Sequence, residues 1–339
     1  MSHVIFAISL LFSLPNTRRK VPFFLTLCTL FLFAALRYDF GNDYMAYYSI
    51  HTAINNGLPS HGQNDLLYKL LNLMIPNFFW FVAFTSLFYM IGIGYLIRIN
   101  LKPTEYWFSM LILLLNPYLF LVHLSSMRQT LAIVIVIFAM EALALRKGVL
   151  FSLLILLASG FHKSALVLLP LYFIINQQKI GKNAMLLILG LIVIMLGTPI
   201  FDWIINLVLP YFPQYTVYYE YGLKNSIRST LISSFFLFLV LFNLDKLDGK
   251  EVVYGKLSLL SVSISVLSAR LALLSRIGMY FDIFTIVTVP RIFSKITNKN
   301  VRLVLFVVMM AIYLLRYFSF FSNPLWNESY SSYRTIMSR

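Results

Sequence analysis

Six basic residues lie within or beside strongly apolar stretches of the chain. They are Arg37, Arg128, Lys163, Arg228, Arg270 and Arg276. Charged side chains at membrane depth are costly and usually face the protein interior or a water-filled cavity, which makes them functional candidates by default. Guanidinium groups bind phosphate oxygens through two parallel hydrogen bonds and stay charged at physiological pH. Several arginines of this kind therefore predict an anion site.

Arg128 is the strongest member of this set. Arg128 and Gln129 begin an otherwise almost entirely apolar helix that runs to Leu145. Snorkelling of the charge from a helix end is the alternative explanation, and it suits Arg37 and Arg316 better.

Two local motifs add candidates for proton transfer. Asp39 and Asp43 are four residues apart, and Gly41 between them permits a tight turn that brings both carboxylates toward one site. A solvated polar turn is the alternative. His162 lies in the middle of an apolar stretch beside Lys163, and imidazole titrates near neutral pH, as a general base should. The alternative for His162 is a structural histidine.

Tyrosines gather in two segments predicted to face the outside, 37–65 and 210–228. They are Tyr38, Tyr44, Tyr47, Tyr48, Tyr211, Tyr215, Tyr218, Tyr219 and Tyr221. An interfacial aromatic belt is one explanation. The other is contact with sugar rings, because tyrosine joins a flat apolar face to a hydrogen-bonding tip.

The composition places these residues in a membrane protein. Of 339 residues, 60% are hydrophobic and 12% are charged, and the mean hydropathy is +0.82. A soluble domain of this size could not bury so much apolar surface, so lipid must be the solvent. The net charge of +15 is divided into small groups between apolar stretches, which argues against nucleic acid as a partner. The one cysteine, Cys28, permits no intrachain disulfide.

The apolar stretches define the predicted fold. They run at 2–14, 21–36, 77–97, 105–122, 128–145, 149–175, 183–209, 229–242, 254–269, 275–290 and 303–320. The basic groups between them fall on one side only if the chain crosses twice between Lys147 and Lys179, with a break at Gly160–Lys163. We expect an all-α polytopic protein of one domain (1–339) with about 11–12 transmembrane helices, one broken helix pair and both termini outside. Its outer loops would lie near 37–76 and 210–228.

Several cofactor motifs are missing from the sequence. It has no zinc-type Cys/His cluster, no Walker A segment and no Asp-x-Asp motif for a metal and a nucleotide sugar. A transferase would therefore use a lipid-linked donor, and we expect neither cofactor nor metal. A divalent ion at Asp39 and Asp43 is the open alternative.

Three segments resemble the signature motifs of the EpsG-type branch of the Wzy-like O-antigen and capsule polymerases. They are Arg37–Tyr44 (RYDFGNDY), Ser126–Ala132 (SMRQTLA) and Ala158–Ala165 (ASGFHKSA), with weaker similarity at Ser275–Phe281 and Asn323–Trp326. The common first motif of that family has Gly and Thr where this chain has Phe40-Gly41-Asn42. The second and third segments are the specific ones, and their order and spacing fit.

The resemblance implies a membrane glycosyltransferase of GT-C-like architecture. It would join undecaprenyl-pyrophosphate-linked oligosaccharides on the outer face of the bacterial cytoplasmic membrane, with a chain-length regulator protein and a flippase as candidate partners. His162 would be the general base, and Asp39 or Asp43 would share that role or orient the acceptor. The predicted substrate-binding residues are Arg37, Tyr44, Arg128, Gln129, Lys163, Arg228, Arg270, Arg276 and Tyr280.

Two other functions compete with this interpretation. A flippase or transporter of lipid-linked oligosaccharide also needs cationic residues in the membrane, but transporters usually contain internal repeats, and this sequence shows none. An O-antigen ligase has the same chemistry with a different acceptor, and only the motif resemblance separates it from a polymerase.

The predicted double crossing can be tested by labelling. A cysteine at position 164, introduced as Ser164→Cys in a Cys28→Ser background, should react with a membrane-impermeant maleimide added outside, because the break at Gly160–Lys163 must reach the outer face. Labelling that requires opening of the cytoplasmic face would contradict both the double crossing and an outer-face role for His162.

Overall fold

A computed structural model describes residues 9, 21–60, 64–208, 210, 227–271 and 274–337. The predicted first helix at 2–14, apart from Ser9, and the basic group at 18–20 lie outside these residues. So do most of the predicted outer loop at 210–228 and all of its tyrosines.

The described chain is an all-α membrane protein in which almost every element is a helix. It divides into two compact units. Unit 1 contains Met1–Ile174 and Asn298–Arg339, and unit 2 contains Ile175–Thr297. The single domain predicted from the sequence stays a prediction.

Unit 1 holds the three motifs singled out above. Its helices are α2 (Val21–Ala35), α3 (Tyr44–Asn55), α4 (Leu66–Met74), α5 (Phe78–Asn100), η1 (Pro103–Glu105), α6 (Tyr106–Leu115), α7 (Pro117–Ser125), α8 (Met127–Ala144), α9 (Gly148–Ser159), η2 (Lys163–Leu168), α10 (Leu171–Ile174), α18 (Lys299–Ser322) and α19 (Pro324–Tyr330). Asparagine side chains cap the two longest: Asn77 accepts from the first turn of α5 and Asn298 from that of α18.

Unit 2 is built around one central helix. Its elements are α11 (Lys182–Gly197), α12 (Ile200–Val208), α14 (Ile227–Leu241), η5 (Leu244–Lys246), α15 (Lys250–Leu267), α16 (Leu274–Asp282) and α17 (Thr285–Lys295). Helix α15 packs against α14, α16 and α17. The buried Ser258 hydroxyl donates to Thr288 Oγ1 at 2.8 Å, and Ser261 bonds Asp282, so polar groups in this apolar interior are paired.

Fewer helices span a membrane by length than the sequence predicts. Helices α5, α8 and α18 are long and apolar enough, and the described residues give up to six spans if each bent helix pair counts as one. The pairs α6/α7, α11/α12 and α16/α17 bend by 60°, 81° and 56°. Pro117 and Pro199 account for the first two bends, because proline disfavours helical geometry at the preceding residue. The sequence prediction of one broken stretch missed all three.

The break predicted at Gly160 is present. Helix α9 ends at Ser159, and a short turn leads into η2, which packs back against α9. The Tyr172 ring stacks on Phe151 near the start of α9 at 5.9 Å between centroids, and its hydroxyl donates to the Arg146 carbonyl at 3.4 Å. The chain therefore returns to the end from which it came. Both arms are shorter than a full membrane span, so the double crossing stays a prediction. We call residues 148–174 the hairpin.

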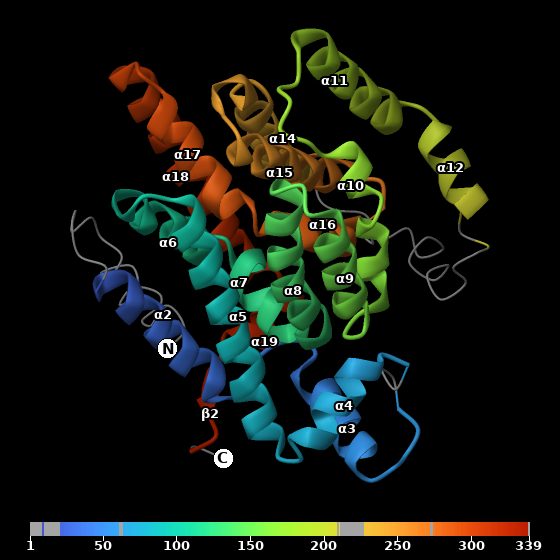
Figure 1. The fold of residues 1–339 in the computed structure, drawn as a ribbon. Helices are drawn as coiled ribbons and strands as arrows, with labels where there is room; N and C mark the ends of the chain where they lie inside the picture. Colours follow the sequence, from blue (N-terminus) through green and yellow to red (C-terminus); the bar gives the residue numbers. More distant parts are fainter. Residues whose placement is uncertain are drawn as a thin grey trace. The chain divides into compact units, whose positions relative to one another are not determined.

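Unit 1 has two distinct ends. Helix α8 has 18 residues, so Arg128 in its first turn lies about 27 Å from Arg146, which follows its last turn. The Gly160 turn contacts α4 and so lies at the Arg128 end. In Figure 1, α3 and α4 lie together below α8 and α9. Helix α5 begins beside α4 and carries Arg98 to the opposite end.

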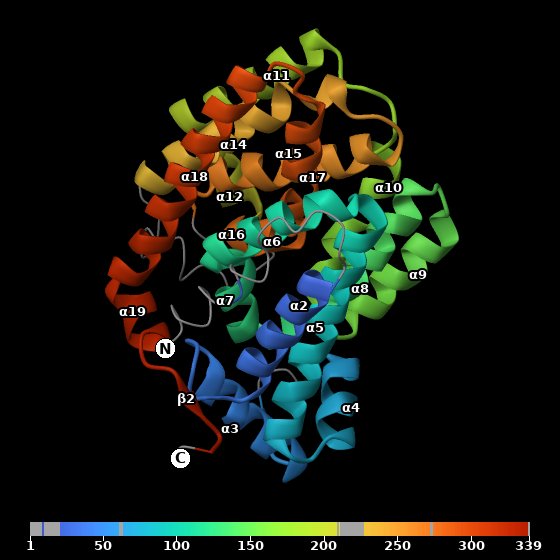
Figure 2. The ribbon, with the colours of Figure 1, turned by 90° about the vertical axis from the view of Figure 1, so that its left-hand side faces the viewer.

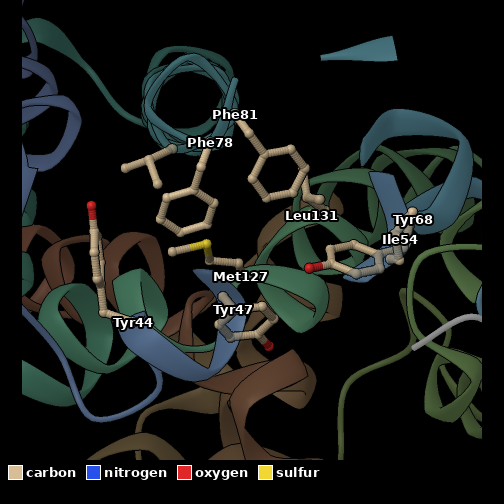
Figure 3. Close-up of a cluster of buried hydrophobic side chains, with 9 residues drawn as sticks. Tyr44, Tyr47, Ile54, Tyr68, Phe78, Phe81, Met127 and Leu131 are labelled. Atoms are coloured by element: carbon tan, nitrogen blue, oxygen red, sulfur yellow. The ribbon is translucent and has the colours of Figure 1, made fainter. Parts of the chain in front are cut away.

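Aromatic rings from α3, α4 and α5 pack around the start of α8 (Figure 3). This cluster contains Tyr44, Tyr47, Ile54, Tyr68, Phe78, Phe81, Val82, Met127 and Leu131, and Phe161 of the hairpin packs against it. Burial of a large apolar side chain contributes about 1.5–3 kcal/mol. The cluster thus fixes α3, α4 and the hairpin turn against the residue before Arg128.

The C-terminal segment completes the same end of unit 1 (Figure 2). Strand β2 (Arg334–Thr335) pairs antiparallel with β1 (Arg37–Tyr38), and Arg37 lies opposite Thr335. The Gly41 amide donates to the Ser329 carbonyl at 3.0 Å. Gly41 has a φ of +115°, which only glycine adopts without strain. The last helix and strand therefore hold the first motif in place.

Candidate functional site

The Arg128 guanidinium lies where α8, α4 and the hairpin turn meet. Its Nη1 forms an ion pair with Asp65 Oδ2 at 3.1 Å, and its central carbon lies 5.8 Å from the centroid of the Tyr68 ring. The Arg128 backbone amide donates to the Tyr47 hydroxyl at 3.5 Å. A quarter of the side chain is exposed (25%), and Nε has no hydrogen-bond partner within the described part of the chain. This guanidinium is therefore fixed on one side and open to an anion on another.

Asp65 connects Arg128 to the hairpin. The residue precedes α4, and its side chain is only 8% exposed. Its carboxyl pairs with Arg128 and lies near Lys163 of the hairpin. Burial raises the pKa of this carboxyl, whereas Arg128 and Lys163 act in the opposite direction. The charge on Asp65 thus depends on its two basic neighbours.

The hairpin turn is anchored on the start of α4. The Gly160 carbonyl accepts from the backbone amides of Leu67 at 2.8 Å and Tyr68 at 3.3 Å, two first-turn donors without a partner inside their own helix. A side chain at Gly160 would put its Cβ 2.6 Å from Leu67, so glycine permits this approach. His162 follows two residues later in extended conformation and half-buried, and Lys163 is exposed.

The first motif lies beside the same cluster. Asp39 and Asp43 are both exposed, Asp39 has a φ of +47°, and Asp43 directly precedes α3. Burial raises the pKa of Tyr47, Arg128 lowers it, and Asp43 adds a further rise. The charge of Asp43 thus acts on Tyr47, the tyrosine that contacts Arg128. No three His, Cys, Asp or Glu side chains group as metal ligands in the described ranges.

Two predicted substrate-binding residues of unit 1 lie in its interior. Tyr44 is buried in the aromatic cluster, and its hydroxyl donates to the Arg37 carbonyl at 3.1 Å. Gln129 is buried in the first turn of α8. Both side chains pack in the interior beside the site, and a direct contact of either with sugar stays a prediction.

Arg37 is also buried, with 1% of its surface exposed. Its Nη1 donates to Ser86 Oγ at 3.0 Å and to the Ala34 carbonyl, and its Nη2 donates to the Leu124 carbonyl at 3.0 Å. These bonds join the end of α2 to α5 and α7. In the structure Arg37 is thus bound by protein groups on several sides.

The other predicted basic residues belong to unit 2. Arg270 forms an ion pair with Asp202, donates from Nη1 to the Leu196 carbonyl at 3.1 Å, and lies over the Phe201 ring. Arg276 is exposed on α16, and Tyr280 is buried one turn later. Arg228 lies in the first turn of α14, and its side chain is outside the described residues.

Sequence reasoning missed Asp65, Tyr47 and Tyr68 as parts of the site. Asp65 is the one acidic residue between positions 44 and 104, and it lies in the predicted outer loop near 37–76. A lone carboxylate in a basic chain was the available signal. Tyr47 was grouped only with the loop aromatics, and Tyr68 was not singled out.

A comparison with protein families identifies the chain. A family model described as the EpsG family matches residues 20–335. The chain belongs to the EpsG family. The match extends from just before α2 to the last residue of β2, so it includes all three motifs. A search of curated proteins and a search of solved structures each return no match.

Membership of the EpsG family indicates a polysaccharide-polymerase type of function with glycosyltransferase-like chemistry. The geometry around Arg128 suits such chemistry. A partly exposed guanidinium can bind an anion, and imidazole and carboxyl groups are the usual proton acceptors for a hydroxyl nucleophile.

The contacts of Arg37 predict that it stabilises the fold. Arg37→Lys keeps the charge but loses the planar fork that bonds Ser86 and Leu124, so unfolding should cost about 2–3 kcal/mol less. Thermal unfolding in detergent would measure this as a lower midpoint. Arg334→Lys is the matched control, since Arg334 is exposed on β2. An unchanged midpoint together with lost activity would instead show that Arg37 acts on substrate.

Proposed function

We propose that this protein is a polysaccharide polymerase that joins undecaprenyl-pyrophosphate-linked oligosaccharide repeat units on the outer face of the bacterial cytoplasmic membrane. The product would be O-antigen, capsule or exopolysaccharide. The observation that carries the proposal is the cluster of Arg128, Asp65 and the His162 turn, which lies at the end of unit 1 opposite Arg146. Basic groups of the Arg146 kind mark the cytoplasmic side.

Arg128 would bind the pyrophosphate of the donor, which is the growing chain. The acceptor hydroxyl attacks the anomeric carbon, and the bond from that carbon to the phosphate oxygen breaks with its electron pair leaving on the lipid pyrophosphate. A guanidinium already held in place stabilises this developing charge without reorganising at the moment of reaction. Its Nε is buried, so the exposed quarter of the side chain would meet the anion.

His162 would accept the proton of the acceptor hydroxyl. It is half-buried beside Lys163, which lies near Asp65. Asp39 and Asp43, both exposed, would orient the acceptor or share the proton, and Lys163 would add positive charge for the lipid-linked substrates. A substrate-binding role for Arg228, Arg270 and Arg276 of unit 2 stays a prediction. The overall architecture would be GT-C-like, without cofactor or metal, and a chain-length regulator and a flippase would be its partners.

Deletion of the gene separates this function from its alternatives. If the protein is the polymerase, the cells should lose the ladder of polysaccharide lengths on a gel but keep single repeat units on their surface. Re-expression of the wild-type gene should restore the ladder. Loss of both the ladder and the single repeats would favour a flippase or a ligase and contradict the proposal.

A comparison of two arginines tests the proposed chemistry. Arg128→Lys keeps the charge but loses the planar fork, so turnover of purified protein with lipid-linked repeat units should fall about a hundred- to a thousandfold, the cost of losing one preorganised charge-stabilising donor. Arg98→Lys is the matched control, because Arg98 is exposed at the opposite end of α5. If Arg128→Lys keeps an activity within a few fold of wild type, Arg128 only anchors the end of the helix, and its proposed role at the pyrophosphate is wrong.

A further inference from the structure

Asp65 lies between the two halves of the candidate site. It pairs with Arg128 Nη1 at 3.1 Å, and Lys163, the residue after His162, is close enough to lower its pKa. Its own helix is bonded to the hairpin through the Leu67 amide and the Gly160 carbonyl at 2.8 Å. The position of Arg128 relative to the His162 turn is therefore set through Asp65.

We propose that Asp65 is a positioning residue: it holds Arg128 against the His162 turn and yields the guanidinium to the pyrophosphate of the incoming donor. This inference rests on the proposed function. A pyrophosphate offers several oxygens and more negative charge than one carboxylate, so it competes well for a guanidinium. A quarter of the Arg128 side chain is exposed, so the anion can approach the guanidinium while Asp65 still holds Nη1.

The bonds at the start of α4 give the exchange its purpose. When Arg128 turns from the carboxylate to the anion, the Leu67 and Tyr68 amides keep their bonds to the Gly160 carbonyl. The hairpin turn then stays in place while the guanidinium moves. His162 thus meets the acceptor hydroxyl at a fixed distance from the leaving group.

A purely structural ion pair would behave in the opposite way. Removing a structural carboxylate leaves a buried cation without a partner and disorders it, so an anion would bind Arg128 less well. Removing a competitor leaves Arg128 available, so an anion would bind better. The sign of the change in affinity separates the two roles.

The test measures inorganic pyrophosphate binding to the purified full-length protein by calorimetry. Asp65→Asn should tighten binding about tenfold or more, which is the value of a hydrogen bond between charged groups. In the polymerisation assay the same variant should lower KM and also lower kcat by up to about a hundredfold, because catalytic groups held an ångström out of place lose about that much.

Controls isolate the Arg128–Asp65 pair. Asp248→Asn makes the same chemical change at an exposed carboxylate paired with Lys179 and Lys295, and both measurements should stay at wild-type values. Asp65→Glu, which keeps the charge, should bind pyrophosphate within a few fold of wild type. In an Arg128→Gln background, Asp65→Asn should no longer change the affinity.

The outcomes are distinct. If thermal unfolding shows that Asp65→Asn is not folded, Asp65→Ser is used instead, because it removes the same charge. Suppose that the wild-type protein polymerises and the Asp65 variant folds. Pyrophosphate binding that is unchanged or weaker in the variant, or an unchanged kcat, then overturns the role of Asp65 but not the proposed function. A wild-type protein that neither binds pyrophosphate nor polymerises overturns the proposed function and this inference with it.

Discussion

A charge inside an apolar helical bundle must find a partner, and this constraint orders the structure around its arginines. Arg37 is fully enclosed and is paired with carbonyl and hydroxyl oxygens. Arg128 and Arg270 are partly exposed and are paired with carboxylates, each over an aromatic ring. The enclosed Arg37 is thus held by protein oxygens, whereas a partly exposed guanidinium paired with one carboxylate can exchange that partner for another anion.

The same constraint explains how the chain can break in an apolar stretch. A turn at Gly160 frees backbone groups that lipid cannot satisfy, so protein must do so. Helix α4 supplies two first-turn amides to the Gly160 carbonyl, and Asp65 directly precedes this helix. The segment that makes the break tolerable is thus also the segment that brings a carboxylate to Arg128. Stability and site assembly depend on the same contacts.

The sequence predicted those features that local residue types determine. Arg128 at the start of an apolar helix and glycine with histidine in the middle of another identified the second and third motifs, and the break at Gly160 is where it was expected. Pro117 could also have predicted the bend between α6 and α7, but the hydropathy pattern shows these two helices as one continuous apolar stretch. Asp65 could not be paired with Arg128, because 63 residues separate them and no local pattern links them. Arg37 and Arg128 differ in how deeply their side chains are buried, and the hydropathy of the sequence does not indicate this difference.

The pairing of β1 with β2 shows why the site cannot be assigned to one segment. Asp39 and Asp43 are exposed, yet the turn between them is held by the Ser329 carbonyl on one side and by Tyr44 packing on the other. The Tyr330 hydroxyl, from the same C-terminal helix, bonds the Leu121 carbonyl at 3.1 Å and Ser125, just before the helix that carries Arg128. The turn that carries the two carboxylates is thus held relative to the start of α8. Because α19 and β2 hold this turn, the positions of the first and second motifs depend on C-terminal residues that follow all three motifs in the sequence.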